Sequence, residues 1–196
     1  FHANPELSFV EVKTAARMAE ELSALGYEVH TGIAKTGVVA LLRNGAGPLV
    51  MMRADMDALP VKERSGLPYA SQVIQENLEG QRFPVMHACG HDSHTAILMG
   101  VAEVLAAHKN QLEGSVKFIF QPAEEGVTEV PMAGAELMVK EGVMQDVDAI
   151  FGLHIWAQVE AGKIGYRPGP TMAAVDILGI NVHGTQSHGA APWSGV

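Results

Sequence analysis

Apolar side chains recur along this chain with two periods, one helical and one extended. Apolar residues recur at helical spacing in three segments, and each is predicted to form an amphipathic helix: residues 12–25, 95–107 and 133–141. Gly26 and Gly142 follow the first and third helices as C-terminal caps. Shorter apolar runs predict strands, and they cover residues 27–30, 37–43, 48–53, 115–121, 148–154, 162–167 and 175–183.

Short motifs predict how these elements begin and end. Ser8 and Glu11 have the spacing of a capping box for the first helix, and Asp92 or Ser93 would cap the second. Residues 44–47 have the Asn/Gly chemistry of a hairpin-like turn. Residues 61–85 show glycine and proline but no clear period, so we expect them to be irregular.

Helices that alternate with strands predict an α/β domain, with a mostly parallel sheet flanked by helices. Ligands of such sheets bind beyond the carboxyl ends of the strands. Asp55 and Asp57 follow one apolar run, Glu124 and Glu125 follow another, and His154 ends a third. The polar residues therefore gather where the topology predicts a site.

The densest chemistry lies in residues 86–94, which hold the only cysteine, Cys89, together with three histidines. Cys89 and His91 precede the second predicted helix, whose positive dipole end would favour a thiolate. A thiolate, an imidazole and carboxylates together suit zinc, cobalt, nickel or manganese better than calcium or magnesium. We therefore expect Cys89, His91 and the carboxylates at the strand ends to meet around metal.

Each of these residues also has a plainer interpretation. A lone cysteine is usually structural, and Glu124 and Glu125 could form only a solvated acidic turn. After a buried strand, however, one glutamate can bind metal while its neighbour serves as general base. His154 is either a satisfied core histidine or a ligand, and we favour the ligand.

The other polar candidates carry weaker signals. Asp55 and Asp57 either hydrogen-bond loop backbone or orient His91 from behind. His188 lies among glycines, in a plain turn or in a loop that presents it to a substrate. For four further histidines, nothing except closeness to the cluster suggests a metal-binding role. We expect ordinary structural roles for His30, His87, His94 and His108.

Composition narrows the class of protein. Hydrophobic residues make up 47% of the chain, which is typical of a globular domain with a substantial core. A net charge of −9, with no Lys/Arg cluster, argues against a nucleic-acid partner. No run of about 18 apolar residues predicts a membrane span. With one cysteine no intrachain disulfide can form, and we expect a cytoplasmic location.

Five short stretches, taken in order, resemble a known family of enzymes. They are residues 5–9, 53–60, 86–92, 121–126 and 152–154. The chain is similar to the aminoacylase/carboxypeptidase family of dinuclear metal amidohydrolases, in the branch of hippurate, N-acyl-amino-acid and indole-acetyl-amino-acid hydrolases. The resemblance implies a metallo-aminopeptidase-like catalytic domain that binds two divalent ions per subunit, of zinc, manganese, cobalt or nickel.

Carried onto this sequence, the resemblance assigns a role to each matching residue. It implies Cys89, His91, Glu125 and His154 as metal ligands, and Glu124 as general base and acid toward a metal-activated water. His188 would bind the substrate. Trp193 stands where this branch usually has a histidine, and the family's last ligand, a histidine near the C-terminus of longer chains, has no counterpart here.

The resemblance also predicts the organisation of the chain. Residues 1–172 would form an incomplete catalytic domain, and residues 173–196 the start of a smaller α+β satellite domain used for dimerisation. The expected reaction is hydrolysis of the amide bond of a small N-acyl amino acid by a homodimer or higher homo-oligomer. Two alternatives remain open: a cysteine hydrolase that uses Cys89 as nucleophile, and a catalytically incomplete fragment that only binds metal.

Overall fold

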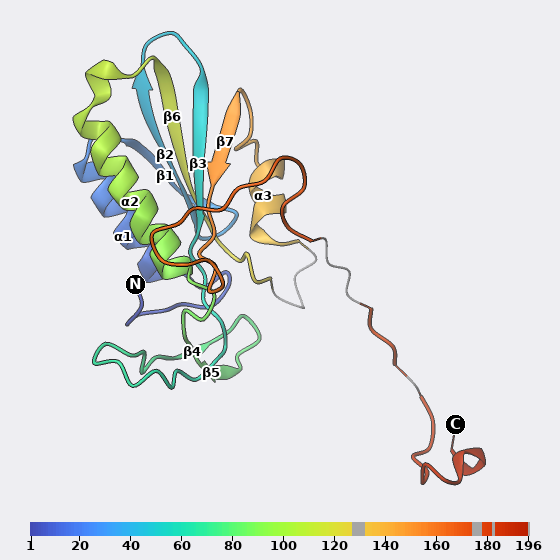
Figure 1. Ribbon diagram of the computed structural model, residues 1–196. Helices are drawn as coiled ribbons and strands as arrows, with labels where there is room; N and C mark the ends of the chain where they lie inside the picture. Colours follow the sequence, from blue (N-terminus) through green and yellow to red (C-terminus); the bar gives the residue numbers. More distant parts are fainter. Residues whose placement is uncertain (127–131, 174–177, 182, 196) are drawn as a thin grey trace. The chain divides into compact units, whose positions relative to one another are not determined.

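The computed structural model describes residues 1–126, 132–173, 178–181 and 183–195. These residues divide into two compact units, Phe1–Trp156 and Ala157–Val196. The first unit holds a sheet, three α-helices and a small hairpin (Figure 1). This division does not test the predicted domain boundary between residues 172 and 173, which stays a prediction.

The elements follow the order expected of an α/β protein, which confirms the predicted fold class. The helices are α1 (Val12–Ala24), α2 (His91–Ala107), α3 (Gly134–Lys140) and the 3₁₀ turns η1 (Lys109–Gln111) and η2 (Pro192–Ser194). The strands are β1 (Glu28–Ile33), β2 (Gly37–Asn44), β3 (Leu49–Asp55), β4 (Ile74–Glu76), β5 (Arg82–Pro84), β6 (Gly114–Gln121) and β7 (Ala149–Gly152).

The main sheet is mixed and has the order β1-β2-β6-β3-β7. β6, β3 and β7 run parallel, whereas β1 and β2 join them by antiparallel pairing. The carboxyl ends of β6, β3 and β7 therefore lie at one edge of the sheet, and the residues that follow them come together there.

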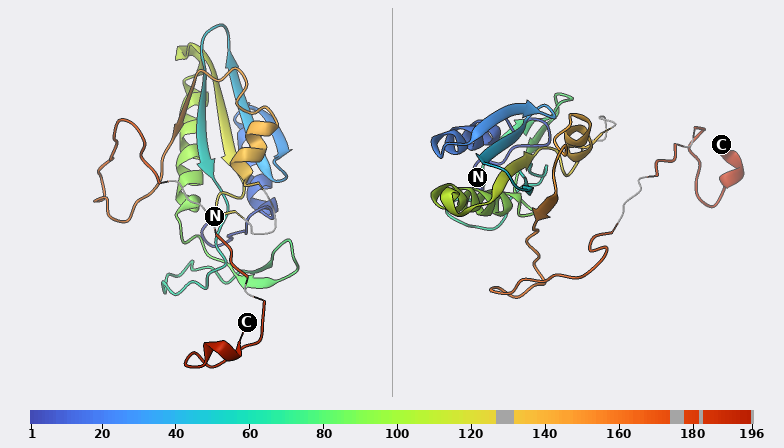
Figure 2. Two further views of the ribbon diagram at one scale, coloured as in Figure 1. Left: turned by 90° about the vertical axis from the view of Figure 1, so that its right-hand side faces the viewer. Right: turned by 90° about the horizontal axis from the view of Figure 1, so that it is seen from above.

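Helices cover both faces of this sheet. α1 and α2 lie on one face and α3 on the other (Figures 1 and 2). Alternate residues of β6 sort accordingly: Phe118 and Phe120 join the core under α1 and α2, while Ile119 joins the core under α3. This alternation explains why β6 has the continuous apolar character of a strand buried on both faces.

The turn at residues 44–47 was predicted to join paired strands, and this prediction is wrong. β6 lies between β2 and β3, so the two strands on either side of the turn do not pair. Gly47 permits this arrangement because it lies against the start of β6. A Cβ on Gly47 would come within 2.6 Å of the backbone nitrogen of Gly114.

Both predicted N-terminal caps are wrong as well. Glu6 caps α1, because its carboxylate accepts hydrogen bonds from the backbone N–H groups of Lys13 and Thr14, at 3.1 and 2.7 Å. α2 begins earlier than expected, at His91, after the left-handed Gly90. The carbonyl of Gly90 accepts the first helical hydrogen bonds, so neither Asp92 nor Ser93 is the cap residue.

Two further segments differ from the pattern. Residues 61–85 contain the β4–β5 hairpin, although their sequence has no clear period. Residues 162–167 were predicted to be a strand, but in the described structure they are irregular, with Ile164 94% exposed and no partner strand. The strand predicted over residues 175–183 lies partly outside the described residues. No helix among the described residues is long and apolar enough to span a membrane.

Candidate metal centre

The predicted site residues of the first unit meet at the carboxyl edge of the sheet. His91 begins α2, Glu124 and Glu125 follow β6, and His154 lies just beyond β7. Ligand atoms of Cys89, His91 and His154 lie within 4.8 Å of one another, and so do those of His91, Glu124 and Glu125. His91 is common to both groups and is fully buried.

The orientation of His91 is set by Asp57. Nδ1 of His91 lies 2.9 Å from the backbone carbonyl of Asp57, so Nδ1 carries the proton and donates. Nε2 is buried and has no hydrogen-bond partner among the described residues. It lies 3.7 Å from Oε2 of Glu124 and 3.9 Å from Oε1 of Glu125.

Nε2 of His91 shows whether the residues present fit a metal ion. A buried polar atom without a partner is costly, and an ion held by Nε2 would satisfy it. The surrounding donors are a thiol, a second imidazole and two carboxylates, which is a set that divalent transition metals bind. The residues present therefore fit such an ion.

The electrostatics of the pocket point the same way. Burial lowers the pKa of His91, but the hydrogen bond with the Asp57 carboxylate and the charges of Asp55, Asp57 and Glu125 outweigh burial and raise the pKa to about 9. Burial, with the nearby charge of Glu125, raises the pKa of the Cys89 thiol to about 12. Burial also raises the pKa of Glu125. Each shift favours positive or neutral groups in an acidic pocket, so the pocket is complementary to a cation.

The raised pKa of Cys89 corrects one expectation. The helix dipole was predicted to favour a thiolate there, yet burial and the carboxylates of Glu125 and Glu124 dominate. Sγ of Cys89 lies 3.5 Å from Nε2 of His154. Without a cation the protonated thiol is favoured, which argues against Cys89 as a free nucleophile.

His94 was expected to be an ordinary histidine, and the structure places it inside the site. Its Nε2 accepts a hydrogen bond from the backbone N–H of Ile155 at 2.8 Å, so its proton is on Nδ1 and is donated to Asp55 at 2.6 Å. Both ring nitrogens are used, so His94 is not free to bind metal. It anchors the backbone beside His154 instead. The three-residue spacing from His91 on one helix could have signalled this.

Both alternatives for Asp55 and Asp57 are met in part: Asp55 accepts a hydrogen bond from the ring of His94, and Asp57 accepts one from the loop backbone at Glu125. Besides His94, Asp55 pairs with Nη1 of Arg53 at 2.8 Å. Burial alone would raise the pKa of Asp55, but the hydrogen bond from His94 and the charge of Arg53 lower it to about 2. Asp57 Oδ2 accepts from the Ser8 hydroxyl and from the N–H of Glu125, at 2.7 and 3.0 Å.

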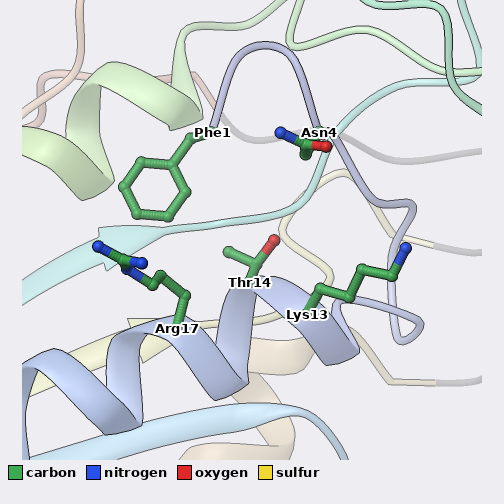
Figure 3. Close-up of a pocket in the computed structure, with 5 residues that line it drawn as sticks. All are labelled: Phe1, Asn4, Lys13, Thr14 and Arg17. Atoms are coloured by element: carbon green, nitrogen blue, oxygen red, sulfur yellow. The ribbon is translucent and has the colours of Figure 1, made fainter.

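The two remaining candidates, His154 and His188, are exposed. The strand that precedes His154 is shorter than predicted and exposed rather than buried, because β7 is an edge strand of the sheet. His188 belongs to the second unit and is exposed. A separate pocket lies along the amino-terminal half of α1, where Lys13, Thr14 and Arg17 face Phe1 and Asn4 (Figure 3). Its lining has no metal-ligating cluster, so it is not the predicted site.

Comparison with known proteins identifies the family. The sequence model of peptidase family M20/M25/M40 matches residues 51–194. The chain belongs to this family. This match confirms the resemblance. The matched range includes Cys89, His91, Glu124, Glu125 and His154.

Relatives agree with this family assignment. The chain is 45% identical over 193 residues to thermostable carboxypeptidase 2 of Saccharolobus solfataricus, covering 97% of this chain and 46% of that protein. It is 43% identical over 192 residues to the N-acyl-L-amino acid amidohydrolase of Geobacillus stearothermophilus, covering 97% and 48%. The chain thus spans about half the length of the curated relatives it matches.

A solved structure shares the fold. A dinuclear metal-binding M20 peptidase of Bacillus subtilis superimposes with a TM-score of 0.75 at 42% identity, covering 86% of this chain and 44% of that one. The α/β sheet and its flanking helices are therefore those of an M20 peptidase.

Proposed function

We propose that the full-length protein is a metal-dependent hydrolase that cleaves the amide bond of small N-acyl amino acids. The observation that carries the proposal is Nε2 of His91, which is buried and has no hydrogen-bond partner in the part of the chain that the structure describes. Ligand atoms of Cys89, His154 and two glutamates lie near His91. The relative named N-acyl-L-amino acid amidohydrolase supports the choice of substrate class.

We assign the metal to Cys89, His91, Glu125 and His154. Two divalent ions of zinc, manganese, cobalt or nickel would be held there, and when bound they would acidify a water and polarise the scissile carbonyl. The chain contributes the orientation: Asp57 holds Nδ1 of His91, which leaves Nε2 beside the carboxylates of Glu124 and Glu125, and Asp57 also holds the N–H of Glu125.

Glu124 is the proposed general base and acid. Its side chain is 40% exposed, far more than that of the neighbouring His91, so water and substrate can reach it. Its carboxylate takes a proton from the attacking water, and the same oxygen returns that proton to the leaving amine nitrogen as the C–N bond breaks. We propose that His188 contacts the substrate, and that the protein is a cytoplasmic homodimer or higher homo-oligomer.

The experiment is to replace Glu124 and Glu125 separately by glutamine in the full-length protein. Glu124→Gln should keep the metal content and lower kcat by about 10²–10⁴-fold, because the proton acceptor is lost. Glu125→Gln should lower the metal content instead. Glu136→Gln, on the surface of α3, is the matched control and should change neither.

Metal add-back separates this proposal from the alternatives. After chelation, activity should return with a divalent transition metal. Retained activity without metal would support a cysteine hydrolase, and bound metal without any turnover would support a metal-binding role. Near-full turnover by Glu124→Gln would show that Glu124 is not the base.

A further inference from the structure

Glu11 is a fully buried carboxylate for which the capping box was the only expected role. It makes no side-chain cap for α1. Instead, its Oε1 accepts a hydrogen bond from the backbone N–H of Ala123 at 2.8 Å, and its Oε2 accepts one from the hydroxyl of Thr36. The carboxylate thus joins the start of α1 to two segments that are distant in the sequence.

The segment that Glu11 holds is the turn that carries the two glutamates of the site. Ala123 is buried and immediately precedes Glu124 and Glu125. Its φ of 46° lies in the left-handed region, which is unfavourable for a residue with a Cβ and persists only where the surroundings impose it. The hydrogen bond from its N–H to Glu11 is one such constraint.

A second buried carboxylate holds the same turn from its other side. Asp57 accepts the N–H of Glu125 at 3.0 Å. Glu124 therefore lies between two anchored residues, Ala123 bonded to Glu11 and Glu125 bonded to Asp57. Asp57 also bonds Nδ1 of His91 through its backbone carbonyl. The same residue therefore holds both the turn and His91, which fixes the distance between them.

Strained backbone is concentrated around Glu11. Besides Ala123, Phe9 has a φ of 61°, and Ala34 and Lys35 have φ values of 48° and 75°. Phe9 lies two residues before Glu11, and Ala34 and Lys35 directly precede Thr36. Nζ of Lys35 lies 4.4 Å from the centre of the Phe9 ring, so these segments also contact each other. Such clusters of strain are typical of functional sites.

We propose that Glu11 is a positioning residue, which holds the Ala123 backbone so that Glu124 and Glu125 face His91. The role of Glu124 in turnover rests on the function proposed above, whereas the constraint on the turn does not. Glu11 acts through hydrogen bonds and not through its charge. A glutamine in its place can accept from Ala123 with its oxygen and donate to the Thr36 hydroxyl with its amide.

The test uses the full-length, metal-loaded protein with Glu11→Met and Glu11→Gln. Methionine matches the length of glutamate but lacks a strong acceptor. We expect Glu11→Met to speed hydrogen exchange of the Ala123 amide at least tenfold. It should also lower kcat about 10–100-fold and leave KM within about twofold, because displacing a catalytic group by about 1 Å can lower the rate about 10²-fold. Glu11→Gln should restore both readouts to near wild type.

The matched control is Glu6→Ala. Glu6 is also buried and also serves the start of α1, but it bonds Lys13 and Thr14 rather than the Ala123 turn. Glu6→Ala should lower the urea midpoint while leaving kcat and Ala123 exchange unchanged. If Glu11→Met does not fold, Glu11→Asp replaces it, because its carboxylate is one methylene shorter, cannot keep both the Ala123 and the Thr36 bonds, and should still speed Ala123 exchange.

The outcomes separate this proposal from the proposed function. Unchanged Ala123 exchange in Glu11→Met, or in Glu11→Asp where that variant replaces it, would overturn the positioning role. A Glu11→Gln variant as impaired as Glu11→Met would overturn the argument that hydrogen bonds and not charge are needed. If even the wild type fails to hydrolyse N-acyl amino acids, the proposed function fails, while the exchange measurement still decides the role of Glu11.

Discussion

Replacing Glu11 by glutamine should change how the stability of the protein depends on pH. Burial raises the pKa of Glu11 from 4.5 to about 7, although its hydrogen bond with Thr36 acts in the opposite direction. A carboxyl whose pKa is raised on folding binds its proton more tightly in the folded state than in the unfolded state. Its contribution to stability is therefore complete below about pH 4.5 and is lost as the pH rises through about 7.

The magnitude follows from the shift itself. At 1.36 kcal/mol per pKa unit, a rise of about 2.5 units amounts to roughly 3 kcal/mol of unfolding free energy between pH 4.5 and pH 8. Glutamine has nearly the same shape and does not titrate. Relative to wild type, Glu11→Gln should therefore become more stable by roughly 3 kcal/mol as the pH rises across this range.

Urea unfolding followed by circular dichroism, at several pH values from 4.5 to 8, measures this difference. Wild type and variant share all the proposed metal ligands, so the pH dependence of metal binding cancels in the comparison. Glu20→Gln, on the exposed side of α1, controls for the loss of one negative charge. A difference between wild type and Glu11→Gln that stays constant with pH would refute the reasoning.

Two further predictions follow from the core and from the site. Phe118 is fully buried, and the centre of its ring lies 5.4 Å from that of Tyr27. Phe118→Ala should therefore lower the unfolding free energy by about 3–5 kcal/mol, measured by urea unfolding. Ile97→Ala, at an exposed position of α2, is the control. Asp55 has its pKa lowered to about 2, so it stabilises the fold above about pH 4 and loses this effect toward pH 2. Wild type should lose roughly 2 kcal/mol more than Asp55→Asn over that interval, and equal losses would contradict the assigned hydrogen bonds.

Local pattern was sufficient for most of the fold. The helical spacing at residues 12–25 and the apolar run at residues 115–121 predicted α1 and β6, because burial on one face or on both leaves a direct trace in the sequence. The motifs around Cys89 and Glu124 also identified the family, and the structure brings those residues together at the predicted edge of the sheet. Whether each one binds metal stays a prediction until metal is measured.

The sequence by itself determined the α-helices, most strands of the main sheet and the chemical groups that stand at their ends, because helical and strand periods depend on near neighbours. Only the tertiary structure decided that β6 pairs between β2 and β3, that Gly90 rather than Asp92 caps α2, and that His94 anchors the backbone beside His154. It also decided that Glu11 bonds Ala123, which is 112 positions away in the chain. Such partners are chosen by which groups are buried against each other, and local periodicity carries no record of that choice.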